Sequence, residues 1–200
     1  VTRSTFTNCG QVCLCTEKVY VHRSLFTPFL ERLKQAAENI KIGYPLEQDV
    51  FIGPLVSKAH QQKVLAYYQL ARDEGAEVVT GGGVPVFNDE RDNGCFIQPT
   101  ILTGLEDEAR VNQEEIFGPV VTVTTFKDEA EALAIANDTE FGLGAGVWTR
   151  DMNRAYRMGR GIEAGRVWTN CYHAYPAHAA FGGYKKSGVG RETHKMMLDH

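Results

Sequence analysis

Hydrophobic residues along this 200-residue chain recur every three or four positions in some stretches and form short continuous runs in others. Residues 26–40 show the helical spacing most clearly, and their apolar side chains would form one stripe along an amphipathic helix. Thr27 is expected to cap this helix, with Pro28 in the first turn, where a missing N–H costs little. The pattern therefore predicts a first helix over residues 26–40.

Capping residues indicate three more helices. Ser57 precedes a helical pattern that runs to residue 71 and ends at Gly75, a residue type suited to the left-handed end of a helix. Asp128, followed three residues later by Glu131, predicts a helix over 128–135, and Asp151 predicts another over 151–162. Short apolar runs predict strands at 19–21, 77–79, 96–102, 120–126, 146–148 and 167–169.

Helices and strands that alternate in this way are typical of an α/β fold with a mostly parallel sheet covered by helices. In such folds, functional residues lie in loops at the ends of strands. Residues 81–94, which are rich in glycine, asparagine and aspartate, predict a long surface loop.

Composition narrows the functional classes. With 43% hydrophobic residues the chain is able to bury one substantial core, so a single domain is expected. A net charge of −4 without basic runs argues against a nucleic-acid partner, and no stretch is long enough to span a membrane. Five cysteines without framework spacing favour a reducing, cytoplasmic location. A chain that opens on Val1 suggests a fragment of a longer protein.

Three cysteines near the start, in the sequence FTNCGQVCLC, are the first candidates for chemistry. Cys9, Cys13 and Cys15 lack the paired spacing of zinc or iron–sulfur sites, so no metal is expected. Gly10 would let the chain turn tightly into a helix whose free N–H groups lower the pKa of Cys13 and bind an oxyanion. Buried, inert thiols remain the alternative, because cysteine is among the most buried residue types.

Other candidate motifs are weaker. The glycine clusters at 142–146, 159–165 and 181–190 lack the strand–turn–helix order or the spacing of nucleotide-binding loops. The six histidines form no metal-binding pattern, although a cysteine hydrolase would place one of them beside Cys13. Glu114 and Glu115, as neighbouring carboxylates, would usually be solvated surface charges. The sequence IFGP that follows them directly makes the pair less ordinary.

Three separate motifs together carry a family resemblance. FTNCGQVC at 6–13, EEIFGP at 114–119 and FGGYKKSGVGRE at 181–192 resemble, in order, three motifs of the NAD(P)-dependent aldehyde dehydrogenases. The resemblance covers essentially the whole chain. It implies the catalytic domain of such an enzyme over residues 1–200, with the NAD-binding domain and the C-terminal oligomerisation strand outside this chain.

The resemblance also implies roles for single residues. Cys13 would attack the aldehyde carbonyl, and its N–H would bind part of the oxyanion, while Val12 and Leu14 would border the substrate. Glu115 would bind the nicotinamide ribose of NAD or NADP, and Phe117 would pack beside the ring. The general base and the oxyanion asparagine of the family lie in segments that this chain does not contain.

The substrate pocket is expected to include His173, Tyr175 and Phe181, which fall in the family's aldehyde-tunnel segment, NCYHAYPAHAAF. Residues 120–200 look closer to bacterial acetaldehyde and other aliphatic aldehyde dehydrogenases. Residues 6–115 look closer to the hydroxymuconic semialdehyde dehydrogenases of aromatic-ring degradation. The resemblance thus implies a small-molecule aldehyde as substrate, with a short aliphatic one favoured, and a homo-oligomeric full-length enzyme. An inactive isolated fragment and a non-catalytic domain are the alternatives.

Overall fold

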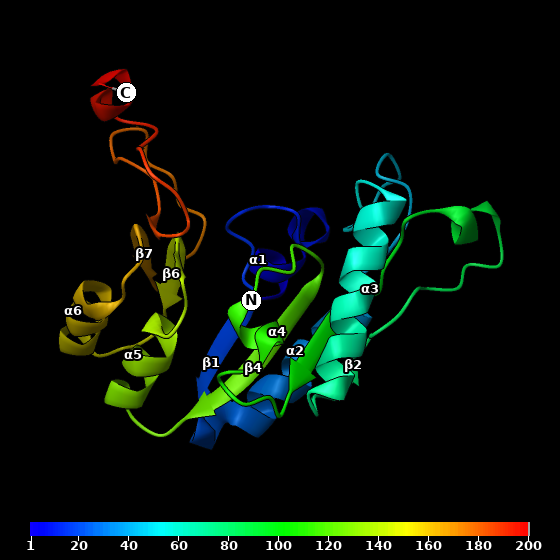
Figure 1. Cartoon of the computed structure of the whole chain (residues 1–200), viewed down its shortest axis with the longest axis horizontal. Helices are drawn as coiled ribbons and strands as arrows, with labels where there is room; N and C mark the ends of the chain where they lie inside the picture. The colour runs from blue at the N-terminus through cyan, green and yellow to red at the C-terminus, as the bar shows by residue number, and fades with distance from the viewer. Residues whose placement is uncertain (200) are drawn as a thin grey trace. The chain divides into compact units, whose positions relative to one another are not determined.

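The computed structural model describes residues 1–199 and divides into two compact units, Val1–Phe126 and Lys127–His200. Each unit is described by itself. The first unit is built on a four-stranded sheet with the strand order β1-β4-β3-β2 (Figure 1). Strand β4 pairs in parallel with both β1 and β3, whereas β2 runs antiparallel along the edge beside β3.

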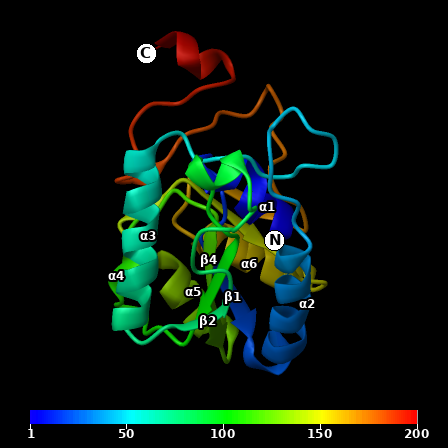
Figure 2. The ribbon, with the colours of Figure 1, turned by 90° about the vertical axis from the view of Figure 1, so that its right-hand side faces the viewer.

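Helices cover both faces of this sheet. Figures 1 and 2 show α2 on one side of the strands and α3 on the other. Strand β3 is buried along its whole length, as is the first half of β4, as expected for inner strands that pack on two sides. The helices of the first unit are α1 (Thr2–Phe6), η1 (Thr7–Gly10), η2 (Arg23–Leu25), α2 (Phe26–Glu38), α3 (Lys58–Asp73), η3 (Glu90–Asn93) and α4 (Arg110–Gln113). Its strands are β1 (Lys18–His22), β2 (Glu77–Thr80), β3 (Thr100–Thr103) and β4 (Val120–Phe126).

The core of the first unit lies between the sheet and its two long helices. From α3, Val64 and Tyr68 are at most 1% exposed, and from the strands Ile101 and Val121 are fully buried. Burying side chains of this size stabilises the fold by about 1.5–3 kcal/mol each. This packing fixes the ends of the strands, where the loops with the candidate site begin.

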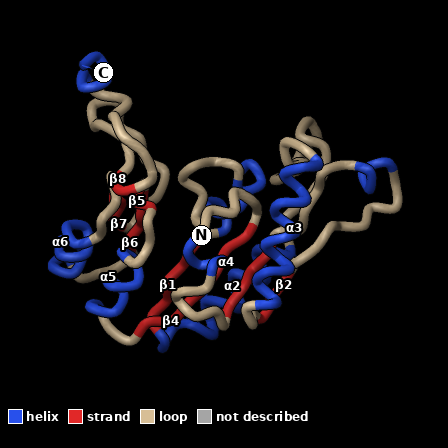
Figure 3. Tube along the Cα trace, viewed as in Figure 1, coloured by secondary structure: helices blue, strands red, loops and turns tan. Residues whose placement is uncertain are grey.

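The second unit contains two small sheets. Strands β6 and β7 pair in parallel and contact α6, while β5 and β8 form an antiparallel pair that Figure 3 labels beside them. Asp128 and Asp151 cap their helices as expected, since their carboxylates accept backbone N–H groups of the first turn. The elements are α5 (Glu129–Asn137), β5 (Phe141–Gly142), β6 (Gly144–Val147), α6 (Met152–Gly161), β7 (Arg166–Thr169), β8 (Tyr184–Lys185) and η4 (Lys195–Asp199).

The fold class expected from the sequence, an α/β fold with a mostly parallel sheet, is confirmed. Two local expectations were wrong. Thr27 lies inside α2 rather than at its cap, because the preceding turn η2 already leads the chain into the helix. The strand expected at 96–102 begins only at Thr100, since Pro99 has no N–H to donate to a neighbouring strand.

Candidate active site

The FTNCGQVC segment makes a strained turn at the start of the first unit. Asn8, Cys9 and Gly10 have φ angles of 50°, 57° and 72°, three left-handed residues in succession. The side chains of Asn8 and Gln11 each donate to the other residue's backbone carbonyl, at 3.2 Å in both cases. The amide oxygen of Gln11 also accepts the N–H of Val56 at 3.0 Å. These bonds hold a conformation that only glycine and asparagine adopt readily.

The chain turns once more at Cys13 itself. The N–H of Cys15 donates to the carbonyl of Val12 at 2.7 Å, and the chain then runs extended into β1. The helix expected at Cys13 is therefore absent, so no helix N-terminus supplies N–H groups to its thiol. The physical reason is that residues 18–22 pair with β4 as a strand, which leaves room for only one tight turn.

The three neighbouring cysteines lie in different surroundings. Cys9 is buried, and its thiol donates to the carbonyl of Gly53 at 2.7 Å. Burial raises the pKa of Cys9 to about 12, and burial with the nearby charge of Glu17 raises the pKa of Cys15 to about 11. Cys13 alone of the three is exposed. The segment thus presents one accessible thiol between two protonated ones.

The EEIFGP segment forms the loop between α4 and β4. Ile116 is buried and anchors the loop, whereas the side chain of Glu115 is exposed and that of Phe117 is half-buried. Phe117 has a φ of 62°, which is unusual for an aromatic residue. An exposed carboxylate beside a half-buried ring suits a ligand that has hydroxyl groups next to a flat ring.

The two segments pack directly against each other. Gly10 lies against the carbonyl group of Gly118, with no room for a Cβ between them. On the other side of Cys13, the carboxylate of Glu17 accepts the N–H groups of Ile116 and Phe117. The structure therefore joins the cysteine segment to the EEIFGP loop both before and after Cys13. Sequence reasoning had assigned Glu17 no role.

In the second unit, residues 170–181 form a loop rich in aromatic side chains. Trp168 on β7 contacts the ring of Tyr175 edge-on at 5.9 Å between centroids, and that of His173 at 6.4 Å. Tyr175 in turn meets Phe181 at 5.4 Å. Tyr175 is 47% exposed and Phe181 is 6% exposed. His173 and Tyr175 thus both contact Trp168, and Phe181 joins them through Tyr175.

Arg166 supports this loop from β7. Its guanidinium group donates to the carbonyls of Ala179 and Ala180 at 2.8 and 3.0 Å. It also lies over the rings of Tyr175 and Phe181, at 5.5 and 5.3 Å from their centroids. The position of Arg166 on a strand gave no signal of this role in the sequence.

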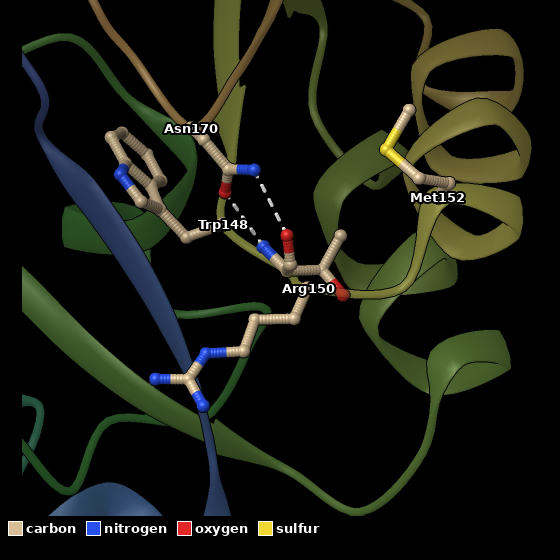
Figure 4. A pocket seen from close by; sticks show the side chains of 5 residues that line it. Trp148, Arg150, Met152 and Asn170 are labelled. Carbon is tan, nitrogen blue, oxygen red and sulfur yellow. Dashed lines mark hydrogen bonds between the residues drawn. The ribbon is translucent and has the colours of Figure 1, made fainter.

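The second unit also has a shallow hollow, lined in part by Thr149 and Asn170 (Figure 4). Thr149 and Asn170 close one side through two hydrogen bonds between the Asn170 side chain and the Thr149 backbone, at 2.9 and 3.0 Å. Figure 4 shows Trp148, Arg150 and Met152 around them. These residues were not among those expected to form a site.

The comparisons with known proteins agree with these motifs. The model of the aldehyde dehydrogenase family matches residues 1–200. This chain belongs to the aldehyde dehydrogenase family. Over 195 residues it is 61% identical to an acetaldehyde dehydrogenase of Pseudomonas aeruginosa, and the match covers 98% of this chain and 38% of that relative. Aldehyde dehydrogenase B of Escherichia coli is 55% identical over 193 residues, with 96% and 38% covered.

Solved structures of aldehyde dehydrogenases share the fold. A betaine aldehyde dehydrogenase of Staphylococcus aureus, solved in complex with NAD+, superposes with a TM-score of 0.96 at 38% identity. The match covers 99% of this chain and 39% of that one. The chain thus spans less than half the length of the aldehyde dehydrogenases that it matches.

For the sites expected from the sequence, the first unit joins the segments of Cys13, Glu115 and Phe117, while the second gathers His173, Tyr175 and Phe181. Val12 is half-buried, and Leu14 is only 3% exposed. Among the residues whose side chains the structure describes, no group of three or more His, Cys, Asp and Glu is placed to hold a metal ion. Among those same residues, no helix is both long and apolar enough to cross a membrane.

Proposed function

We propose that this chain is the catalytic domain of an NAD(P)-dependent aldehyde dehydrogenase that oxidises a short aliphatic aldehyde to its acid. The observation that carries the proposal is the packing of the cysteine segment on the EEIFGP loop, which leaves Cys13 exposed between two contacts with that loop. The acetaldehyde dehydrogenase of P. aeruginosa, 61% identical, supports the same reaction class. The NAD-binding domain is proposed to come from outside this chain.

Cys13 is the proposed nucleophile. Its thiolate attacks the aldehyde carbon, so that a C–S bond forms and the carbonyl oxygen becomes an oxyanion, which the N–H of Cys13 is proposed to bind. Loss of hydride from that carbon leaves a thioester, and water then releases the acid and the free thiol. Val12 and Leu14 are proposed to border the aldehyde at this point.

Glu115 and Phe117 are proposed to bind the nicotinamide end of the cofactor. The residues fit this group, because an exposed carboxylate accepts two ribose hydroxyls and a half-buried aromatic ring packs beside a flat one. The bound cofactor supplies the hydride acceptor. The NAD+ complex of the S. aureus betaine aldehyde dehydrogenase supports NAD as the cofactor.

A neutral aldehyde is favoured over one that carries a carboxylate. His173, Tyr175 and Phe181 are proposed to line the pocket, and Arg166, which lies over two of these rings, already donates to backbone carbonyls. Its guanidinium group therefore already binds the loop, which makes it a poor partner for a substrate carboxylate. A homo-oligomeric full-length enzyme is also proposed, on the family resemblance alone, and size-exclusion chromatography tests it.

The test uses an assembled enzyme, in which this chain replaces the matching 195-residue segment of the P. aeruginosa relative. We expect it to form NADH from acetaldehyde with a higher kcat/KM than from hydroxymuconic semialdehyde. Cys13→Ala should abolish turnover. Cys9→Ala, which removes a buried thiol of the same segment, should retain it. Normal turnover by Cys13→Ala, or NADH formation by the isolated chain, would contradict the proposal.

A further inference from the structure

Glu17 bonds two successive N–H groups of a loop that lies 100 residues further along the chain. One oxygen of its carboxylate accepts the N–H of Phe117 at 2.7 Å, and the other accepts the N–H of Ile116 at 3.2 Å. Glu17 itself lies four residues after Cys13, immediately before β1. Hydrogen bonds to an ionised group are roughly twice as strong as neutral ones. The loop is therefore held by a charge from the cysteine segment.

Two side chains of α3 hold the same stretch of backbone. Lys63 donates to the carbonyl of Glu115 at 3.3 Å, and the ring nitrogen Nε2 of His60 donates to the carbonyl of Phe117 at 2.7 Å. Together with Glu17, these residues bond four polar groups of the backbone of residues 115–117. The arrangement fixes where the exposed side chain of Glu115 leaves the loop.

Such support is needed because the loop conformation is strained. Phe117 has a φ of 62°, in the left-handed region, where a non-glycine residue costs about 1–2 kcal/mol. A strained residue of this kind persists only where its surroundings over-determine it. The two N–H groups that Glu17 accepts belong to Phe117 and to the residue before it, which is where the backbone turns.

A direct chemical role for Glu17 does not suit this geometry. Both of its carboxylate oxygens face backbone N–H groups, so neither is directed at a reacting atom. Burial and the neighbouring charge of Glu115 raise the pKa of Glu17, while the two N–H groups and Lys18 act in the opposite direction. The desolvation of this half-buried carboxylate is offset in part by the backbone N–H groups that it accepts.

We propose that Glu17 is a positioning residue for the cofactor, one that locks the backbone of residues 115–117 so that Glu115 meets the nicotinamide ribose while Phe117 packs beside the ring. The inference rests on the proposed function and assigns a new residue to that same site. It also explains a link between the two motifs, since the segment that carries the nucleophile holds the loop that receives the cofactor.

Glu17→Gln in the assembled enzyme tests the proposal, because the variant keeps the size of the side chain but loses its charge and one acceptor. We expect the Kd for NAD+ to rise about tenfold. Without cofactor, the rate of amide hydrogen exchange at Ile116 and Phe117 should also rise about tenfold. Hydrolysis of p-nitrophenyl acetate without NAD+, which reports the Cys13 thiol, should change by less than about twofold. Glu17→Asp keeps the charge with a shorter reach and should give an intermediate Kd.

The chain contains a matched control. Asp92 accepts the N–H groups of Phe87 and Asn88 at 2.8 and 3.0 Å, and Asn88 has a φ of 61°, so the same arrangement recurs in the long loop between β2 and β3. Asp92→Asn should speed amide exchange at Phe87 and Asn88 and leave the Kd for NAD+ unchanged.

The outcomes separate the two levels of inference. If the unmodified assembled enzyme binds no NAD+, the proposed function fails and this inference with it. If that enzyme binds NAD+ and both Glu17 variants bind it equally well, only the positioning role is wrong. An equal loss of NAD+ affinity in Asp92→Asn would also overturn the role, because it would show a general loss of stability.

Discussion

A Cβ atom placed on Gly10 would lie 1.9 Å from the carbonyl oxygen of Gly118, so the backbones of the two motif segments touch. Real Cβ atoms essentially never come this close to another heavy atom, and Gly10 also has a φ of 72°. The contact requires glycine for two independent reasons, its lack of a side chain and its left-handed conformation. It fixes the distance between the turn that leads to Cys13 and the loop that carries Glu115.

Gly10→Ala should therefore destabilise the fold by about 3 kcal/mol or more, at the severe end of single substitutions. Gly75→Ala is the matched control, because Gly75 has a φ of 92° but nothing lies within 4 Å of its added Cβ. Gly75→Ala should lose only about 1 kcal/mol of stability, the cost of the left-handed backbone for a residue with a Cβ. Thermal unfolding of both variants of the assembled enzyme measures the difference. Equal losses would show that the contact with Gly118 does not matter.

Thiol alkylation should distinguish the cysteines of the first motif. At pH 8, a pKa of about 12 leaves about one Cys9 thiol in 10⁴ ionised, and burial further limits access of the reagent. Cys15, with a pKa of about 11, should also react slowly. Cys13 is exposed, and so is Cys171 in the second unit.

Iodoacetamide followed by mass spectrometry should thus modify Cys13 and Cys171 before Cys9 and Cys15. Exposure alone does not favour Cys13 over Cys171, because both thiols are exposed. Cys171→Ser removes the second exposed thiol and leaves Cys13 as the first site of labelling. Rapid labelling of Cys9 in that variant would contradict the burial described for the turn.

The sequence predicted most elements because local signals agreed with the final packing. Ser57, Asp128 and Asp151 cap helices as their positions indicated, since capping depends on a few neighbouring residues. Strand β4 was predicted with its bounds because a continuous apolar run suits an inner strand. The family motifs placed Cys13 and Glu115 in separate segments, which the structure joins.

What could not be predicted depends on partners far along the chain. Glu17 reads as an ordinary charged residue before a strand, and only the folded chain brings it to Ile116 and Phe117. The turn after Gly10 was expected to lead into a helix, although the strand predicted at 19–21, which pairs with β4, leaves room for only one tight turn. Arg166 was likewise missed, because its carbonyl partners lie 13 and 14 residues away on a loop.

Cofactor binding should weaken in acid as Glu17 gains a proton. The pKa of this carboxyl lies above the usual 4.5, chiefly because of burial, with Glu115 adding to the rise and Lys18 opposing it. A protonated carboxyl turns an O–H toward an N–H and so loses one acceptor. We expect the Kd for NAD+ to rise as pH falls through this raised pKa, and this step should be missing in Glu17→Gln.

The stability of the fold should respond to the same proton in the opposite sense. Because folding raises the pKa of Glu17, the folded chain binds a proton more tightly than the unfolded chain. The contribution of this group to stability is fully present below its unfolded pKa and is lost as pH rises through the folded pKa. At pH values between the unfolded and the folded pKa of Glu17, a fall in pH thus stabilises the fold while it weakens NAD+ binding at the loop. Parallel titrations of NAD+ affinity and thermal unfolding, in the parent and in Glu17→Gln, check the two signs.

Arg166→Lys should disturb the aldehyde pocket and spare the cofactor site. Lysine keeps the charge but lacks the planar group that donates to Ala179 and Ala180 and lies over Tyr175 and Phe181. We expect the KM for acetaldehyde to rise about fivefold, with the Kd for NAD+ unchanged, from the loss of these contacts.

Arg154→Lys provides the comparison for this prediction within the same unit. Arg154 is on α6 and pairs with Glu129 at 3.2 Å on an exposed surface, where an ion pair contributes little to stability. Steady-state kinetics of both variants with acetaldehyde should therefore show a change only for Arg166→Lys. If the two variants shift the KM alike, the effect belongs to the surface charge of the unit. If neither does, the loop at 170–181 keeps its shape without the guanidinium group, and the aromatic contacts around Trp168 are sufficient to hold it.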